Sequence, residues 1–242
     1  IASMGLSPKT DMAQCHNRGD ISVNFGIVQD IRMGGIVGRY YRASSETGNE
    51  LSVENCSNSG NLYYSVKDEM KVYSSSTTYY NMIGGCFPQI DDISTGLMTL
   101  SNCDNSGTIE VDMAPTNSHI LTMVEVGGII GYIRGQVEVR DCENRGKEIT
   151  LTMNKPNKNF TIGGLFGRVI AYADASKPIL LSNCANYSKV LSNITEKSLV
   201  ESYIGGAIGE MYAYADKTYT IRLNNIDNYG SVVSMSQNYI GN

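Results

Sequence analysis

The chain has 242 residues, of which 41% are hydrophobic and only 18% charged, and 25 of them are glycine. This composition is typical of a β-rich, turn-rich protein with enough apolar residues for a continuous core. The net charge of −5 argues against nucleic acid or an anionic membrane surface as partner, and no run of about 18 apolar residues predicts a membrane span.

The chain opens with "IASMGLSP", which contains no signal peptide and no initiator Met. We interpret this as the start of a mature or truncated chain, which leaves secretion open. The segment "CHNRGDISV" follows at residues 15–23 and is the first of six copies of one pattern. Internal periodicity is the first signal to interpret, because it decides the whole fold.

The six copies share their first position, an Asn two residues later and, in five copies, a Gly four residues later. They begin at Cys15, Cys56, Cys103, Cys142, Cys184 and Ile226, with spacings of 41, 47, 39, 42 and 42 residues. The Asn residues are Asn17, Asn58, Asn105, Asn144, Asn186 and Asn228. The glycines are Gly19, Gly60, Gly107, Gly146 and Gly230, and Ser188 takes this place in the fifth copy.

Apolar and polar residues alternate on both sides of each copy, as at Leu51 and Val53 before Cys56 and at Leu62 and Tyr64 after it. Alternation with a period of two, bounded by Gly and Asn, predicts short, half-buried strands. A second motif lies between the copies, in the forms MGGIVG, IGGCFP, VGGIIG, IGGLFG and IGGAIG. We therefore expect three strands per repeat: one in the Gly-Gly motif, one before the cysteine and one after the N-x-G turn.

A single unit of this kind cannot bury its apolar face, whereas stacked units can. Parallel pairing between stacked units predicts an all-β fold, a right-handed parallel β-helix (β-solenoid) of five to six coils, with roughly 42 residues and three strands per coil. The alternative is a β-propeller, which needs four strands per blade and usually an aromatic signature, while this chain has no Trp.

We expect one solenoid domain over residues 1–242, as a segment of a longer chain. Both ends continue the repeat pattern without an atypical capping segment. The exposed edges of the end coils then predict further coils in the parent chain or end-to-end stacking of this piece.

The Gly-Gly motifs at 34–38, 127–131, 163–167 and 205–209, each followed by a C-x-N-x-G type segment, resemble GLUG-type repeats. Such repeats occur in large surface and adhesin-like proteins of bacteria. The resemblance covers nearly the whole chain and implies a secreted or cell-surface solenoid without catalytic residues. Pro88 in place of the last Gly of the second motif is a local departure.

The tripeptide Arg18-Gly19-Asp20 matches the core of integrin-binding loops, but the repeat explains it better. Gly19 is the glycine of the repeated turn, where we expect it to be required, and the positions of Arg18 and Asp20 accept varied residues in the other copies. An adhesion signal is therefore not needed to explain these residues.

The repeated Asn suits a turn, because its short side chain tolerates left-handed backbone and bonds neighbouring backbone groups. Six copies at one position predict an internal ladder of amide hydrogen bonds. Glycosylation is the alternative, because "NYS" at 186 and "NIT" at 193 match the acceptor pattern.

Six cysteines in a chain of presumed extracellular origin raise the question of disulfides. Five of them share a position that the sixth copy gives to Ile226, and Cys86 occupies an apolar position of the Gly-Gly motif. We therefore expect six free thiols that act as small core residues. With no C-x-x-C and only His16 and His119 as histidines, we expect no metal and no cofactor.

The candidate binding residues are Tyr172, Asp174, Tyr214 and Asp216, in two matching Tyr-Ala-Asp stretches after the fourth and fifth Gly-Gly motifs. Stacking would place two tyrosines and two carboxylates side by side, which suits a sugar ring. The plainer interpretation is a pair of tyrosines that cover a corner of the coil.

These features together predict a non-catalytic, extracellular or cell-surface solenoid that presents or spaces a binding surface for a glycan or a protein. The alternative is a polysaccharide-active β-helix enzyme, a lyase or glycoside hydrolase, which would gather acids on one outward face. The outward positions two and four residues before each cysteine include Glu54, Asp11 and Glu138, but neither set concentrates acids on adjacent coils. Loop residues such as Asp91 and Asp92 could still contribute.

Overall fold

The computed structural model describes residues 9–25, 30–41, 50–66, 78–92, 96–113, 121–154, 156, 158–171, 178–195, 200–213 and 220–236. Within these ranges the chain forms strands and turns and no helix. The strands pair in parallel with their equivalents in the neighbouring repeats, and they form four sheets, named here A to D. The fold is thus all-β with parallel sheets, as expected for a β-solenoid.

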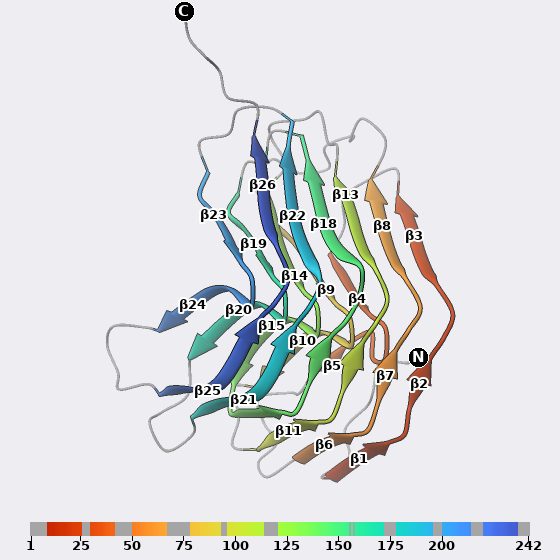
Figure 1. The fold of residues 1–242 in the computed structure, drawn as a ribbon, viewed down its shortest axis with the longest axis vertical. Coiled ribbons are helices and arrows are strands. Elements are labelled where there is room, and N and C mark those ends of the chain that lie inside the picture. The colour runs from red at the N-terminus through yellow and green to blue at the C-terminus, as the bar shows by residue number, and fades with distance from the viewer. Residues whose placement is uncertain are drawn as a thin grey trace, which may run out of the picture.

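Each repeat passes through the sheets in the order B, C, D and A. Sheet B contains β1 (Lys9–Ala13), β2 (His16–Asn17), β6 (Glu50–Glu54), β7 (Ser57–Asn58), β11 (Met98–Ser101), β12 (Asp104–Asn105), β16 (Val137–Arg140), β17 (Glu143–Asn144), β21 (Ile179–Asn186) and β25 (Ile221–Asn228). Sheet C contains β3 (Ile21–Phe25), β8 (Leu62–Val66), β13 (Ile109–Met113), β18 (Glu148–Met153), β22 (Lys189–Ile194) and β26 (Val232–Ser236). Figure 1 shows the strands of sheet C side by side in chain order, from red to blue.

The Gly-Gly motif lies at a corner between the other two sheets. Sheet D contains β4 (Ile31–Gly34), β9 (Thr78–Gly84), β14 (Leu121–Gly127), β19 (Phe160–Gly163) and β23 (Ser202–Gly205). Sheet A contains β5 (Tyr40–Tyr41), β10 (Phe87–Asp92), β15 (Ile130–Gly135), β20 (Phe166–Ala171) and β24 (Ile208–Ala213). The sequence predicted three strands per repeat, with one through the Gly-Gly motif, and this was wrong. The two glycines instead turn the chain so sharply that a strand lies on either side of them.

Steric crowding explains why this corner needs glycine. A Cβ on Gly127 would lie 2.0 Å from the carbonyl oxygen of Ile130, and one on Gly128 would lie 2.0 Å from that of Gly164. No side chain fits at such distances, so the backbone can close the corner only without one.

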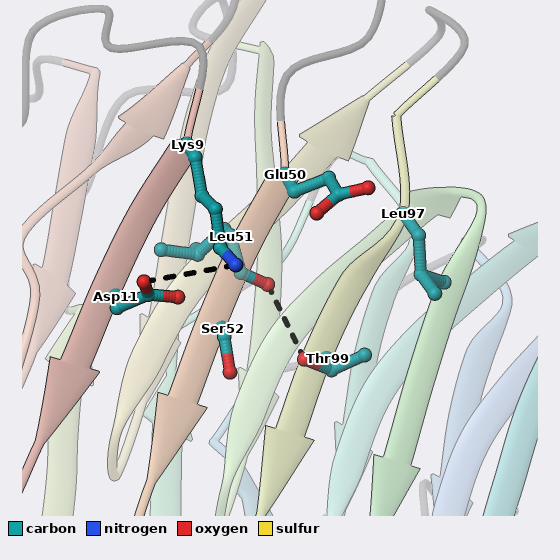
Figure 2. Close-up of a pocket in the computed structure, with 7 residues that line it drawn as sticks. All are labelled: Lys9, Asp11, Glu50, Leu51, Ser52, Leu97 and Thr99. Atoms are coloured by element: carbon teal, nitrogen blue, oxygen red, sulfur yellow. Dashed lines mark hydrogen bonds and ion pairs between the residues drawn. The ribbon is translucent and has the colours of Figure 1, made fainter.

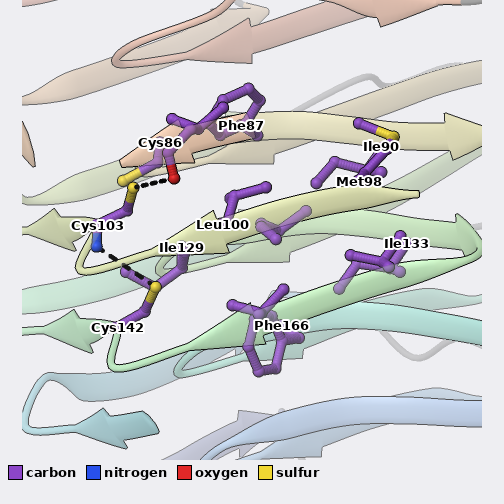
Figure 3. Packing of buried hydrophobic residues seen from close by; sticks show 14 of the residues in the cluster. Cys86, Phe87, Ile90, Met98, Leu100, Cys103, Ile129, Ile133, Cys142 and Phe166 are labelled. Carbon is purple, nitrogen blue, oxygen red and sulfur yellow. Dashed lines mark hydrogen bonds between the residues drawn. The ribbon is translucent and has the colours of Figure 1, made fainter. Parts of the chain in front are cut away.

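Among the described residues there are two large apolar cores and one small buried cluster, which consists of Met82, Tyr132 and Ile170. The first lies between sheets A and B, and Figure 3 shows it with Phe87 and Phe166 from sheet A and Met98 and Leu100 from sheet B. The second lies between sheets C and D. Equivalent residues stack in columns, because register is kept from repeat to repeat: Leu100 pairs with Val53 on one side and Val139 on the other. Burial of each such side chain contributes about 1.5–3 kcal/mol to the stability of the fold.

The repeated Asn residues form a hydrogen-bonded ladder at the junction of the two cores. Each Nδ2 donates to the Oδ1 of the next Asn along the chain, at 2.7–3.0 Å, through all six residues. Asn144 also donates from Nδ2 to the carbonyl oxygen of Gly164 at 2.8 Å. The ladder therefore ties the turn between sheets B and C to the Gly-Gly corner between sheets D and A.

Left-handed backbone occurs before the cysteine and not at the ladder Asn. The φ angles of Gln14, Asn55, Asn102, Asp141, Asn183 and Asn225 lie between 51° and 55°. Asn and Asp adopt this conformation more readily than other residues that carry a Cβ. The sequence pattern had suggested the later Asn for this role.

Gly19 is less constrained than its equivalents. A Cβ on Gly60 or Gly107 would lie 2.0 Å from the carbonyl oxygen of the equivalent glycine in the preceding repeat, whereas a Cβ on Gly19 would meet nothing within 4 Å. The N-x-G glycine is thus required by close stacking and not by the turn itself, so the expectation for Gly19 was wrong.

All six cysteines are free thiols. Five of them are buried and Cys15 is half-buried, and all belong to the core between sheets A and B or pack against it. Burial raises the pKa of the Cys56 thiol to about 11 and also raises that of Cys86. Hydrogen bonds with Cys142 lower the pKa of Cys103 and of Cys184, against the effect of desolvation. The cysteines therefore serve as small residues of the core.

Candidate functional site: the pocket between sheets A and D

The outer faces of sheets A and D meet at the Gly-Gly corner and enclose a pocket, called here the A–D pocket. Its volume is about 350 Å³, and it is lined by Arg32, Tyr80, Met82, Gln89, Asp91, Met123, Tyr132, Arg134, Arg168 and Ile170. Both walls consist of parallel strands, which hold their side chains in fixed register. The pocket is therefore a rigid site with aromatic, charged and apolar groups.

The wall from sheet D presents two columns of paired positions, and Tyr80 and Met123 form the shorter one. Arg32 pairs with Met82, Met82 with Glu125, Glu125 with Thr161, and Thr161 with Tyr203. These residues alternate with core residues of the same strands, so they all project from the outer face.

The wall from sheet A presents two such columns. In one, Gln89, Tyr132, Arg168 and Glu210 are paired in turn. In the other, Asp91, Arg134, Ile170 and Tyr212 are paired in turn.

A chain of hydrogen bonds crosses between the two walls. Arg32 Nε donates to Gln89 Oε1 at 2.6 Å, and Gln89 Nε2 donates to Asp91 Oδ2 at 3.0 Å. Arg134 donates to both oxygens of Asp91, at 2.6 and 2.8 Å. Such bidentate pairs fix both partners in orientation, so Asp91 serves mainly to hold Arg134.

Glu125 is the most deeply buried charged residue of this region, with 2% of its surface exposed. Arg168 donates from Nη1 to its Oε1 at 3.3 Å, while Arg168 Nε lies 2.8 Å from Glu210 Oε2 without hydrogen-bond geometry. Desolvation raises the pKa of Glu125 to about 7, although the charge of Arg168 partly opposes it. Glu125 Oε2 and Thr161 Oγ1 are buried without a hydrogen-bond partner in the described structure.

A second pocket, of about 240 Å³, lies on the outer face of sheet B (Figure 2). It is lined by Lys9, Asp11, Glu50, Leu51, Ser52, Leu97 and Thr99. Its charged pair, Lys9 and Asp11, is 3.9 Å apart and largely exposed. Exposed pairs of this kind contribute little, and no aromatic residue lines this pocket, so the A–D pocket is the better candidate.

The binding residues predicted from the sequence, Tyr172, Asp174, Tyr214 and Asp216, lie outside the described residues. In sequence they directly follow β20 and β24, which are strands of the pocket wall.

The remaining motifs have structural roles where the structure describes them. Asp20 accepts a hydrogen bond from the backbone N–H of Asn61 at 2.8 Å, so one oxygen of the Arg-Gly-Asp carboxylate supports stacking. Asn186 is fully buried in the ladder and offers no accessible site for a glycan. Across the described ranges, no three His, Cys, Asp or Glu side chains are grouped to hold a metal ion. Nor does this part of the chain contain a helix long and apolar enough to cross a membrane.

Sequence reasoning named Asp91, but as a loop residue, whereas it lies on strand β10 and lines the pocket. The columns tested for a site were those before each cysteine, so the pocket as a whole was missed. The informative positions lie two residues before the first glycine of the motif, at Arg32, Met82 and Glu125, and beyond the motif, at Gln89 and Tyr132. Reading the sequence in columns around the Gly-Gly motif would have revealed them.

The chain was also compared with known proteins. No protein-family model, no curated protein and no solved structure matches it. The function must therefore be inferred from the geometry of the site.

Proposed function

We propose that this protein is a non-catalytic solenoid that presents a glycan-binding surface, and that the A–D pocket is part of this surface. The observation that carries the proposal is the combination of Tyr80, Tyr132 and three arginines around one pocket on rigid parallel strands. Aromatic rings beside polar groups suit the apolar faces and hydroxyl groups of a sugar. A protein ligand is the other partner that such a surface could take.

The setting that we propose is a right-handed β-helix of five to six coils in a secreted or cell-surface protein of the adhesin type. Parallel strands joined by crossover connections are right-handed in nearly all proteins, which supports the handedness. The resemblance to GLUG-type repeats supports a bacterial surface location. Tyr172, Asp174, Tyr214 and Asp216 would extend the binding surface beyond sheet A.

The test is a glycan array, followed by titration of each hit with two variants. Tyr80→Ala should weaken binding at least about tenfold, because it removes a ring from the pocket. Tyr187→Ala is the matched control, since Tyr187 is exposed to nearly the same extent (41% against 39% for Tyr80) but lies outside the pocket. A protein that binds no glycan, or that loses binding equally in both variants, would contradict the proposal.

A polysaccharide-active enzyme is the second candidate, and Glu125 is the observation that favours it. A carboxyl whose pKa is about 7 is suited to general acid catalysis at neutral pH. However, Glu125 Oε2 is buried without access to solvent, and Asp91 is held by Arg134. We therefore expect no cleavage in a parallel polysaccharide screen; cleavage that Glu125→Gln abolishes would favour the enzyme.

A further inference from the structure

The charges that line the A–D pocket are mostly positive. Arg32, Arg134 and Arg168 line it with a single carboxylate, that of Asp91. Glu125 and Glu210 bind Arg168 but are not among the lining residues. A ligand in this pocket therefore meets an excess of guanidinium groups, although the whole chain carries a net charge of −5.

Arg32 differs from the other two arginines in its partners. Arg134 and Arg168 bind carboxylates, whereas every hydrogen bond of Arg32 in the described structure goes to a neutral acceptor. These acceptors are Gln89 Oε1 and the carbonyl oxygens of Ile31, at 3.1 Å, and Tyr80, at 2.6 Å. They use Nε and Nη1, and no hydrogen bond of Nη2 occurs among the described residues.

The pKa of Arg32 is lowered, chiefly by desolvation and also by the charge of Arg39, although the charges of Asp30, Glu125 and Asp91 oppose this. A half-buried guanidinium without a bound carboxylate is a strong site for an anion, since an anionic ligand restores the lost electrostatic stabilisation. Tyr80 lines the same pocket as Arg32, accepts a hydrogen bond from it at the backbone carbonyl, and is 39% exposed.

We propose that the A–D pocket binds a uronic acid residue of an acidic glycan, with the sugar ring against Tyr80 and its carboxylate on Arg32. This inference rests on the glycan-binding function proposed above and adds the chemical class of the ligand. Arg134 and Arg168 are positioned by their carboxylate partners and add positive potential, while Arg32 supplies the specific contact.

The test is calorimetric titration of the 242-residue protein with oligogalacturonate, oligomannuronate and hyaluronan fragments, each beside its methyl ester. At least one acid should bind at least about tenfold more tightly than its ester, as expected for one charge-assisted contact. Arg32→Gln should reduce this ratio to about twofold or less, because the carboxylate loses its partner. Arg145→Gln is the control, since this arginine is exposed and stacks on Tyr187 outside the pocket.

Arg32→Gln also removes hydrogen bonds to two carbonyl groups and could therefore disturb the fold. A second variant that leaves Arg32 in place tests the same proposal. Met123 lines the same pocket and pairs in register with Tyr80. Met123→Glu should weaken acid binding at least about fivefold through charge repulsion, while Met123→Gln should not.

Three results would overturn the inference. Equal affinity of acids and esters would reject the uronic acid and leave glycan binding in place. Polyglutamate that binds as tightly as the oligouronates would reject the glycan as ligand. Absence of binding to every glycan would reject this inference together with the proposed function.

Discussion

At the scale of single residues, Glu125 links the pocket to the stability of the fold. Desolvation raises its pKa to about 7, the nearby charge of Glu210 acts in the same direction, and the charges of Arg168 and Arg32 oppose the rise. The folded protein therefore holds this proton more tightly than the unfolded chain. The stability that this proton adds is fully present below pH 4.5, the ordinary pKa of a Glu side chain. It is lost as the pH rises through 7, the pKa of Glu125 in the folded protein.

We expect Glu125→Gln to remove this pH dependence. The free energy of unfolding of the wild type, relative to the variant, should fall by on the order of 3 kcal/mol between pH 4.5 and pH 8. Urea unfolding at intervals of pH measures this difference. Glu110→Gln, at an exposed position of β13, controls for the loss of a carboxylate. A difference that stays constant with pH would contradict the assignment.

The Asn ladder makes a second prediction for single residues. Asn144 is fully buried, donates to Gly164 and Asn186, and accepts from Asn105. Asn144→Ala removes these three bonds and leaves the carbonyl oxygen of Gly164 without its side-chain donor, so the variant should lose about 3 kcal/mol of unfolding free energy. Asn17→Ala, at the half-buried end of the ladder, should lose only about 1 kcal/mol. Equal losses in urea unfolding would show that burial of the ladder adds no stability.

At the scale of elements, the Gly-Gly corner is the feature on which sheets A and D depend. A methyl group on Gly128 would lie 2.0 Å from the carbonyl oxygen of Gly164 and 2.2 Å from Asn144 Nδ2, whereas one on Gly19 meets open space. Gly128→Ala should therefore cost about 3 kcal/mol or more, and Gly19→Ala should stay within about 0.5 kcal/mol. Thermal unfolding of both variants checks this, and a Gly128→Ala protein as stable as the wild type would refute it.

The elements also show what the sequence could and could not predict. The register of sheets B and C follows from the Cys and N-x-G positions, because a period-two pattern repeated at constant spacing fixes which residues face inward. Asn105, for example, pairs with Asn58 and Asn144 as the alignment requires. The predicted number of strands per repeat was wrong at the Gly-Gly motif. Two consecutive glycines interrupt the alternation of apolar and polar residues, so the pattern does not reveal that the chain turns a corner there.

The pocket could not be predicted from the period-two pattern for a different reason. A residue such as Glu125 is polar and projects outward from its strand, so the pattern predicts that it is exposed. It is buried because a second sheet folds against this face, and that angle between sheets is a property of the corner. In the sequence, only the position of Glu125 two residues before the Gly-Gly motif indicates that this residue lies near the corner.

At the scale of the whole molecule, the last described strands expose positions that are buried elsewhere. Leu223 on β25 is 44% exposed, whereas Leu181, its partner on β21, is 1% exposed. Val232 on β26 is 44% exposed, whereas Val190 on β22 is fully buried. The hydrogen bonds of the ladder also all run in one direction, and among the described residues Asn228 Nδ2 donates to Gly230 and to no further Asn.

These observations predict that the 242-residue protein associates head to tail with a second copy. Stacking in the same direction would cover Leu223 and Val232, and it would continue the parallel sheets and the ladder. A contact of this kind does not close on itself, so sedimentation at rising concentration should show a mass that keeps increasing without a plateau at the dimer. The double variant Leu223→Lys and Val232→Lys should stay monomeric, because two buried, unpaired charges at the contact cost several kcal/mol, whereas Tyr187→Lys should associate like the wild type. A wild type that remains monomeric, or that stops at a dimer, would rule out this head-to-tail contact.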